Sequence, residues 1–290
     1  MSDRRGLFAS VFLVTLAIRC LFVFQWTQTP YATMPLLDAK VYHEWAQAIA
    51  AGDFLRGKAF YQSPLYPYFL GLIYALFGEH FALVGVINAL FEATTATLLA
   101  ALTLALFESR AGALIAAGLF AFYRSAIFYT APVMKEPLGL LLETAFLYVL
   151  YRAFQRPKVR SFFISGLLLG LAALVRGNFL CLAPIVLLYG FFLFRKSFSV
   201  KACFFVLGLM LAVAPATLHN YLVSGDFVLT NYTDGFNLYI GNSPYANGTN
   251  AYPPEVSTDP VQEELNTIWV ATDELGRALS PSEVSSYWRS

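Results

Sequence analysis

Five polar residues beside the apolar runs of this sequence could do chemistry together. They are two carboxylates, a phenol and two cations, namely Asp38, Glu136, Tyr42, Lys135 and Arg176. A carboxylate can take or orient the proton of an attacking hydroxyl, and a positioned cation can stabilise the charge of a departing phosphate. We therefore take Asp38 and Glu136 as candidate catalytic residues, and Tyr42, Lys135 and Arg176 as candidate substrate-binding residues.

Asp38 opens the stretch "DAKVYHEWAQAIA" just past the first apolar run, and it has two interpretations. As an N-cap its carboxylate would accept backbone N–H bonds, because Asp is among the preferred caps. As a general base it would share one helical face with Tyr42 and Trp45, a surface suited to a sugar or to the membrane interface. Taken by itself, the residue favours the cap.

Lys135, Glu136 and Arg176 also have two interpretations each. In "APVMKEP" the pair can simply start a helix, since an acid is favourable near the N-terminal dipole and Pro suits the first turn. Alternatively the pair faces Asp38 across a cavity, where it could bind a phosphate, coordinate a divalent ion or position a hydroxyl. Arg176, in "LVRGN", can snorkel to the interface or bind a lipid phosphate through its planar fork.

Four further charges fall inside apolar runs, where a charge is costly and usually paired or functional: Arg19, Glu92, Arg124 and Glu143. Arg19 and Glu143 lie at similar depths, so we expect a structural ion pair to hold them. The three histidines, His43, His80 and His219, lack the spacing of metal ligands, and we expect no zinc site.

Composition places the chain in a membrane. It is 58% hydrophobic and only 13% charged, with a mean hydropathy of +0.60, whereas soluble domains carry about 25% charged residues. The net charge of +1 gives no field that would attract nucleic acid. The three cysteines all lie in apolar runs and predict neither a disulfide framework nor a thiolate metal site. We predict an all-α integral membrane protein.

Seven apolar runs are the predicted spans: Leu7–Trp26, Phe81–Phe107, Ala111–Tyr129, Pro137–Tyr151, Phe162–Val175, Phe179–Phe194 and Ala202–Leu218. The apolar stretch Ser63–Gly78 is short and contains two prolines, so we interpret it as an interfacial helix in a large first loop. With the N-terminus in the cytoplasm, this count places "RAFQRPKVR" and "RKSFSVK" inside, as the positive-inside rule requires.

The remainder of the chain differs in composition. Residues 219–290 are rich in Asn, Gly, Pro, Ser and Thr and include the acidic, helix-like "DPVQEELNTIWVATDELGRALS". We predict two parts, a membrane module over 1–218 and an extracytoplasmic segment over 219–290. Because "EVSSYWRS" is helix-like and has no obvious terminus, we expect this segment to be the start of a longer C-terminal region.

Several stretches, in this order, resemble bacterial polyprenyl-phosphate-sugar glycosyltransferases: "LLDAKVYHEWAQAIAAGDF", "YQSPLYPYFLGLIYALFG", "KEPLGLLL", "GLLLGLAALVRGN" and "PATLHNYLVSGDF" followed by "GFNLYIGN". These are integral-membrane enzymes of the GT-C type, related to protein O-mannosyltransferases and to the aminoarabinose transferases of lipid A. The resemblance covers nearly all of residues 7–248. It implies a seven-span module in the inner or plasma membrane, with its active site on the extracytoplasmic side.

The resemblance also assigns roles. Asp38 takes the place of the family's first-loop acid, a base or acceptor-binding carboxylate, and Glu136 that of a second-loop acid. Two positions depart from the family. Some relatives have a phosphate-contacting lysine before Pro-Pro-Leu, where this chain has Gln62 and Ser63, and many have Arg-Asn after the seventh span, where this chain has His219-Asn220. Lys135 or Arg176 would then supply the positive charge.

The implied partners are a polyprenyl-phosphate sugar as donor, a glycan, lipid or protein as acceptor, and membrane lipids. No nucleotide cofactor is implied, and a divalent metal is compatible with the reaction without being required. Two other functions stay open. A multi-span transporter or lipid flippase would need Glu92 and Glu143 to share a cavity at the membrane midplane. A scaffold subunit would use the outward C-terminal segment to recruit a partner.

Overall fold

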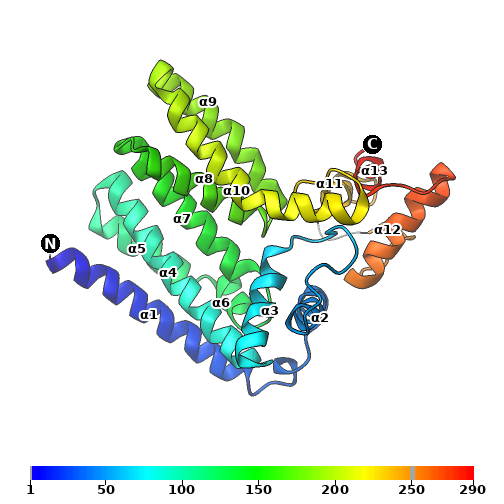
Figure 1. The fold of residues 1–290 in the computed structure, drawn as a ribbon. Coiled ribbons are helices and arrows are strands. Elements are labelled where there is room, and N and C mark those ends of the chain that lie inside the picture. The colour runs from blue at the N-terminus through cyan, green and yellow to red at the C-terminus, as the bar shows by residue number, and fades with distance from the viewer. Residues whose placement is uncertain (1, 249–251) are drawn as a thin grey trace.

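Helices form all the regular structure in the residues that the structure describes, 2–248 and 252–290. In this computed structural model α1, α4, α5, α7, α8 and α10 lie side by side as a bundle, while α2, α3 and α11 to α13 gather at one end of it (Figure 1). The predicted all-helical membrane class is confirmed. The helices are α1 (Ser2–Trp26), α2 (Asp38–Ala50), α3 (Leu65–Phe77), α4 (Phe81–Phe107), α5 (Arg110–Ala121), α6 (Arg124–Thr130), α7 (Glu136–Gln155), α8 (Val159–Ala173), α9 (Leu182–Phe194), α10 (Ser199–Ser224), α11 (Asp234–Asn242), α12 (Pro260–Leu275) and α13 (Pro281–Tyr287), with short 3-10 turns at Pro30–Ala32, Gly177–Cys181 and Arg195–Phe198.

The membrane-spanning helices match most of the predicted spans. Among the described residues, five helical stretches are long and apolar enough to cross: Arg4–Trp26, Phe81–Phe107, Glu136–Gln155, Gly177–Phe194 and Ser199–Ser224. A sixth span exists if α5 and α6 are taken together, bent by 55° at the break between them. The predicted fifth span corresponds to α8, whose 15 residues extend only about 22 Å. The count of seven therefore stays a prediction.

α8 and α10 pack with their backbones in contact. A Cβ added to Gly166 would meet the carbonyl oxygen of Phe205 at 1.9 Å, and one added to Gly208 would meet that of Phe163 at 2.1 Å. Small residues allow this close approach between membrane helices, where packing rather than the hydrophobic effect drives association. The short α8 is thereby held along a full-length neighbour.

The apolar stretch before the second span forms α3, and its 13 residues are too few to cross a bilayer. α3 packs mainly against α2. Tyr66, Leu70 and Tyr74 of α3 form a core with Tyr42 and Ala46 of α2. The two helices therefore form one packed pair at the end of the bundle, and their interfacial position stays a prediction.

A buried ion pair lies where α1, α4 and the α5–α6 break meet. The guanidinium of Arg19 contacts the carboxylate of Glu92, and neither side chain is exposed. Arg19 also donates to the carbonyls of Ala121 (2.6 Å) and Phe120 (3.0 Å) at the end of α5. Thr130, at the end of α6, donates its hydroxyl to Glu92 at 3.0 Å. The break thus leaves helix-end carbonyls that Arg19 satisfies.

This arrangement corrects two expectations. The partner of Arg19 is Glu92 on α4 and not Glu143 on α7, because equal depth in the membrane does not fix which way a side chain faces. Arg124, expected inside a continuous third span, instead starts α6 just after the break and is exposed.

The C-terminal segment packs on the first loop. Tyr232, Phe236, Val284 and Trp288 share a core with Tyr61, and backbone N–H groups of residues 232 and 233 donate to the carbonyls of residues 60 and 61 at 3.1 and 3.2 Å. α10 continues past residue 218 to its C-terminal Ser224. The division at residue 218 stays a prediction.

The topology can be tested by cysteine labelling. In a variant without Cys20, Cys181 and Cys203, single cysteines at Leu55 and at His80 flank α3. If α3 does not cross, an impermeant thiol reagent added outside should label both, and a cysteine at Lys158 should stay unlabelled. Labelling of only one flank from outside would contradict this topology.

Glu92→Gln should strongly destabilise the protein, because Arg19 would keep a buried charge without a counter-charge. Removing one partner of a buried pair costs about 3–5 kcal/mol. Thermal unfolding in detergent is the measurement, and Glu143→Gln, which leaves the pair intact, is the control. An equal loss of stability in both variants would contradict the pairing.

Candidate active site

A polar cavity of ≈ 620 Å³ opens at the end of the bundle that carries α2 and the C-terminal segment. Four of the five residues singled out from the sequence line it: Asp38, Tyr42, Lys135 and Arg176. Glu136 is not among the lining residues, but its Oε1 accepts a hydrogen bond from Nη2 of Arg176 at 3.0 Å. The fold thus brings together residues from three separate loops.

Asp38 is the first residue of α2 and not its N-cap. The cap position belongs to Leu37, and no side chain among the described residues caps this helix. Leu37 has φ 53° and ψ −130°, a conformation that favours glycine and is strained for other residues. The Asp38 carboxylate accepts instead a hydrogen bond from Nε2 of Gln62 at 3.3 Å. The cap interpretation is therefore wrong for this residue.

Tyr42 lies one helical turn further along α2, with 1% of its surface exposed. Its ring packs edge-on against Tyr66 with centroids 5.4 Å apart, and Nζ of Lys135 lies 5.8 Å from the ring centroid. Burial, reinforced by the charges of Asp38 and Glu136, holds the pKa of the phenol well above its usual value. None of the described residues bonds to this hydroxyl, so a neutral donor remains free at the cavity.

Lys135 faces both signs of charge. Burial, followed by the nearby Arg176 guanidinium, lowers the pKa of its ammonium group, whereas Glu136, Asp38 and Asp234 act in the opposite direction. The residue precedes α7, in which Glu136 occupies the first turn, so the pair does start a helix. That role is compatible with a role in the cavity, because Lys135 itself lines it.

Gly177 keeps the loop after Arg176 close to α11. A Cβ at this position would meet Oδ2 of Asp234 at 2.8 Å and Oδ1 of Asn231 at 3.0 Å. The Asn231 amide also donates to Oδ1 of Asp234 at 3.2 Å. The cationic loop and the C-terminal segment therefore form one continuous wall.

His219 and Asn220 bind backbone groups of the first loop instead of facing the cavity. The Asn220 side chain accepts from the Phe60 N–H at 2.9 Å and donates to the carbonyls of Val228 (3.0 Å) and Thr230 (3.2 Å). His219 stacks on the Phe60 ring at 4.1 Å between centroids. These contacts fix the segment that presents Gln62 and Ser63 to the cavity.

The C-terminal segment supplies cavity residues that sequence reasoning missed, namely Asn231, Asp234, Asn237, Tyr252, Glu263 and Arg289. Glu263 is the most buried of the charged ones, with 8% exposed. The only sequence signal for it is the amphipathic, acidic pattern of α12. Its contacts with Tyr61 bridge 202 positions along the chain, which no local pattern reveals.

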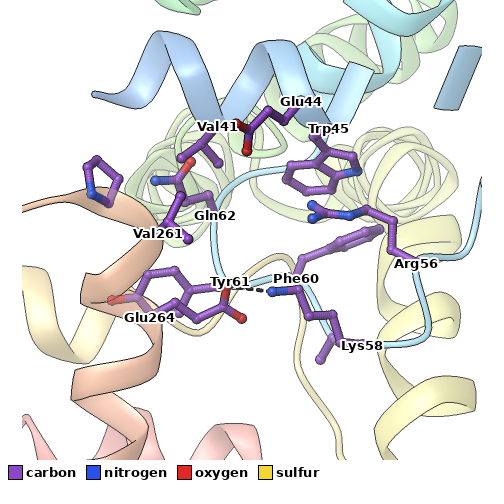
Figure 2. Close-up of a pocket in the computed structure, with 12 residues that line it drawn as sticks. Val41, Glu44, Trp45, Arg56, Lys58, Phe60, Tyr61, Gln62, Val261 and Glu264 are labelled. Carbon is purple, nitrogen blue, oxygen red and sulfur yellow. Dashed lines mark hydrogen bonds and ion pairs between the residues drawn. The ribbon is translucent and has the colours of Figure 1, made fainter. Parts of the chain in front are cut away.

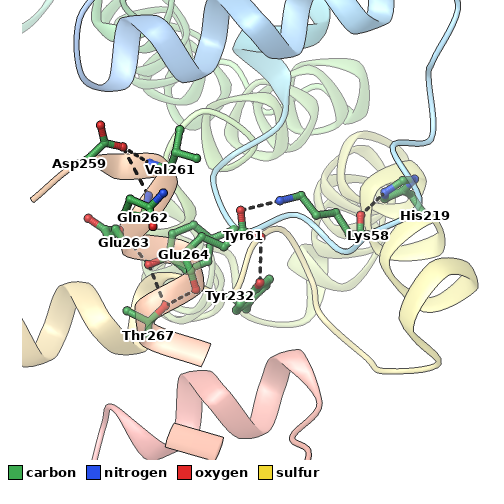
Figure 3. A network of polar contacts seen from close by, with 10 residues as sticks. All are labelled: Lys58, Tyr61, His219, Tyr232, Asp259, Val261, Gln262, Glu263, Glu264 and Thr267. Carbon is green, nitrogen blue, oxygen red and sulfur yellow. Dashed lines mark hydrogen bonds and ion pairs between the residues drawn. The ribbon is translucent and has the colours of Figure 1, made fainter. Parts of the chain in front are cut away.

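Gln62 also lines a second, smaller crevice of ≈ 100 Å³ between α2, the segment before α3, and α12 (Figure 2). There the guanidinium of Arg56 lies 4.7 Å from the Trp45 ring centroid. Beside this crevice, Lys58 pairs with Glu264 at 2.6 Å, and Tyr232 donates to Glu264 at 3.2 Å (Figure 3). These contacts attach α12 to the first loop.

An apolar groove of ≈ 590 Å³ adjoins the polar cavity, and Asp38 lines both. Its walls come from the end of α1, the loop before α2, and the α6–α7 connection, with Trp26, Leu37, Phe128 and Met134 among them. A lipid chain needs such an apolar path, and a charged headgroup needs the polar cavity beside it.

Glu92 and Glu143, the acids inside apolar helices, line neither the polar cavity nor the apolar groove. Glu92 is fully buried in its ion pair with Arg19, so it does not line an open path. Among the described residues no cluster of three or more His, Cys, Asp or Glu side chains could hold a metal ion.

A bundle of apolar helices with a charged cavity and an apolar groove at one end suits an integral membrane protein that acts on lipid-linked polar substrates. Residues 61–219 match the model of the dolichyl-phosphate-mannose-protein mannosyltransferase family, and the chain belongs to this family, since the match spans more than half of it. The match includes Lys135, Glu136 and Arg176 but stops short of Asp38 and Tyr42. No curated protein and no solved structure gives a significant match.

Family membership confirms the resemblance drawn from the sequence motifs. It defines a membrane glycosyltransferase whose donor is a sugar carried on a polyprenyl phosphate. The order of the motifs was therefore sufficient to identify the family.

The lowered pKa of Lys135 can be measured by competitive acetylation followed by mass spectrometry, because only the neutral amine reacts. Half-maximal labelling should occur below pH 10.5, the usual lysine value. Arg176→Gln removes a neighbouring positive charge and should move this midpoint to higher pH. An unchanged midpoint in the variant would show that Arg176 does not act on Lys135.

Proposed function

We propose that this protein transfers a sugar from a polyprenyl-phosphate donor to a hydroxyl of a glycan, lipid or protein acceptor on the extracytoplasmic side of the cell membrane. The observation that carries the proposal is the position of Asp38, which lines both the apolar groove and the polar cavity. The polyprenyl chain occupies the groove, and its phosphate and sugar enter the cavity. Basic loops at the opposite end of the bundle support the assignment of sides.

The reaction is a single displacement that inverts the anomeric carbon. The acceptor oxygen attacks this carbon, the bond from the carbon to the phosphate oxygen breaks, and polyprenyl phosphate leaves with the bonding electrons. Asp38 takes the proton of the acceptor hydroxyl. Gln62, which donates to Oδ1 of Asp38, orients the carboxylate for this step.

Lys135 and Arg176 bind the phosphate and stabilise the charge that develops as it leaves. Arg176 is partly neutralised by Glu136 at 3.0 Å, and this contact holds its guanidinium at the cavity wall. Glu136 therefore acts as a positioning residue rather than as a second base. The Tyr42 hydroxyl, buried and unbonded among the described residues, is available to donate to the phosphate or sugar.

Asp38→Asn tests the base directly. Since Asp38 does not cap α2, Asn and Ser should both leave the fold intact. Sugar transfer should fall by ~10²–10⁴-fold, the usual contribution of a general base. The measurement is transfer of radiolabelled sugar from polyprenyl-phosphate donors in membranes that contain the protein.

Asp53→Asn is a matched control, because Asp53 follows the far end of α2 and is exposed, and the one hydrogen bond described for its carboxylate comes from the local Arg56 N–H at 2.9 Å. It should transfer sugar at the parent rate. Near-normal transfer by Asp38→Asn would remove Asp38 from catalysis and leave Glu136 as the acid to test.

A further inference from the structure

The polar cavity has two chemically different walls. Lys135 and Arg176 stand at the ends of α7 and α8, on the side of the membrane bundle. The C-terminal segment provides the other wall, where Asn231, Asp234 and Glu263 present amide and carboxyl groups beside the Tyr252 ring, and Arg289 contributes one cation. Cations bind a phosphate through charge-assisted hydrogen bonds. Carboxyl and amide groups can hydrogen-bond to the hydroxyls of a sugar, and an aromatic ring can pack on its apolar face.

Glu263 is held in a defined orientation within this second wall. Its Oε1 accepts from the Tyr61 hydroxyl at 2.8 Å and its Oε2 from the Tyr252 hydroxyl at 2.6 Å. Thr267 adds a contact of 3.4 Å to the Tyr61 hydroxyl (Figure 3). Each carboxyl oxygen has one phenol donor and keeps a further lone pair for another hydrogen bond.

No described residue forms an ion pair with Glu263, in contrast to the adjacent Glu264, which pairs with Lys58 at 2.6 Å. Burial raises the pKa of the Glu263 carboxyl, while the two phenol hydrogen bonds act in the opposite direction and the charge of Asp38 raises it further. Burying an acid without a counter-ion lowers the stability of a protein. Such an acid in the wall of a cavity therefore indicates a role in binding a ligand.

Consecutive residues connect this acid to the proposed base. Tyr61 donates to Glu263 on α12, and Gln62 donates to Asp38 on α2. The segment that carries both is fixed by backbone hydrogen bonds to residues 232 and 233. Both carboxyl groups line the same cavity, so that a sugar whose anomeric carbon lies near Asp38 can extend toward Glu263.

We propose that Glu263, oriented by Tyr61 and Tyr252, accepts hydrogen bonds from hydroxyl groups of the donor sugar and sets the sugar preference of the enzyme. This inference rests on the proposed function, and it concerns a residue outside the part of the chain that matches the family, 61–219. The membrane bundle then holds the lipid and the phosphate, and the C-terminal segment recognises the sugar. Glu263 is a binding residue and takes no proton in the reaction.

The test compares a donor with its sugarless analogue. With the purified 290-residue protein, the KM for polyprenyl-phosphate mannose and the inhibition constant of bare polyprenyl phosphate are measured for the parent and for Glu263→Gln. The variant should raise the KM about 10- to 100-fold, as for a lost hydrogen bond to a charged group. The inhibition constant should not change. A second donor carries glucose, which differs from mannose in the orientation of one hydroxyl. The ratio of the KM values for the two donors should lie closer to one in the variant than in the parent.

Three further variants separate recognition from folding. Asp273→Asn, the same acid-to-amide change at an exposed position of α12, should leave both constants unchanged. The double variant Lys135→Ala with Arg176→Ala should weaken donor and bare polyprenyl phosphate alike. Tyr61→Phe removes one of the two phenol donors to Glu263 and should raise the KM for the donor by a smaller factor. It therefore replaces Glu263→Gln in the test if Glu263→Gln does not fold.

Several outcomes would overturn the proposal. Equal weakening of the donor and of bare polyprenyl phosphate, together with a lower melting temperature, would make Glu263 structural. A higher KM for the acceptor with an unchanged KM for the donor would assign Glu263 to the acceptor side. If the parent protein retained its fold but used neither sugar-bearing donor, the proposed function would fail as well. If the parent were active and Glu263→Gln had the same KM for the donor, this inference alone would be refuted.

Discussion

The buried ion pair between Arg19 and Glu92 is the interaction on which the site depends. It joins α1 to α4 and, through the carbonyls of Ala121 and Phe120, to the break that separates α5 from α6. The same cluster holds Thr130, whose hydroxyl donates to Glu92 and whose carbonyl accepts from Asn88 at 3.1 Å. The chain passes from Thr130 to Lys135 in five residues, so a charge cluster inside the bundle fixes the loop that carries a cation into the cavity. A buried pair contributes little net stability by itself, but it specifies one arrangement of the three helices that it joins.

The opposite wall depends on a different constraint, the path of residues 58–63 between α10 and α12. Asn220 and His219 bind the backbone of this segment and act as its structural anchor. Because the backbone is fixed on both sides, the Tyr61 side chain reaches Glu263 on α12 and the Gln62 side chain reaches Asp38 on α2. The position of the proposed base in α2 and the position of Glu263 in α12 therefore depend on one segment.

The sequence predicted the parts of this molecule that follow from hydropathy and from charges at the ends of apolar runs. Asp38, Lys135 and Arg176 were found because a charge beside a span must lie at the surface, and the structure brings them to one cavity. Rotation about a helix axis is not encoded in hydropathy, and this is why Arg19 was paired with the wrong acid. The break between α5 and α6 was also missed, since Arg124 is the one charge in an otherwise apolar stretch and the carbonyls before the break bind the distant Arg19. Glu263 depends on contacts over 202 positions and was beyond any local argument.

The backbone at Leu37 connects the groove to the proposed chemistry. A leucine with φ 53° is strained, and glycine would adopt the same turn at lower cost. The turn directs Asp38 into the cavity instead of leaving it as a cap, while the Leu37 side chain, 65% exposed, lines the apolar groove. In the proposed reaction this one residue therefore contacts the lipid and orients the base beside it. A glycine would satisfy the backbone and lose the apolar contact, so the strain is explained by the need for both functions at the junction between lipid and sugar.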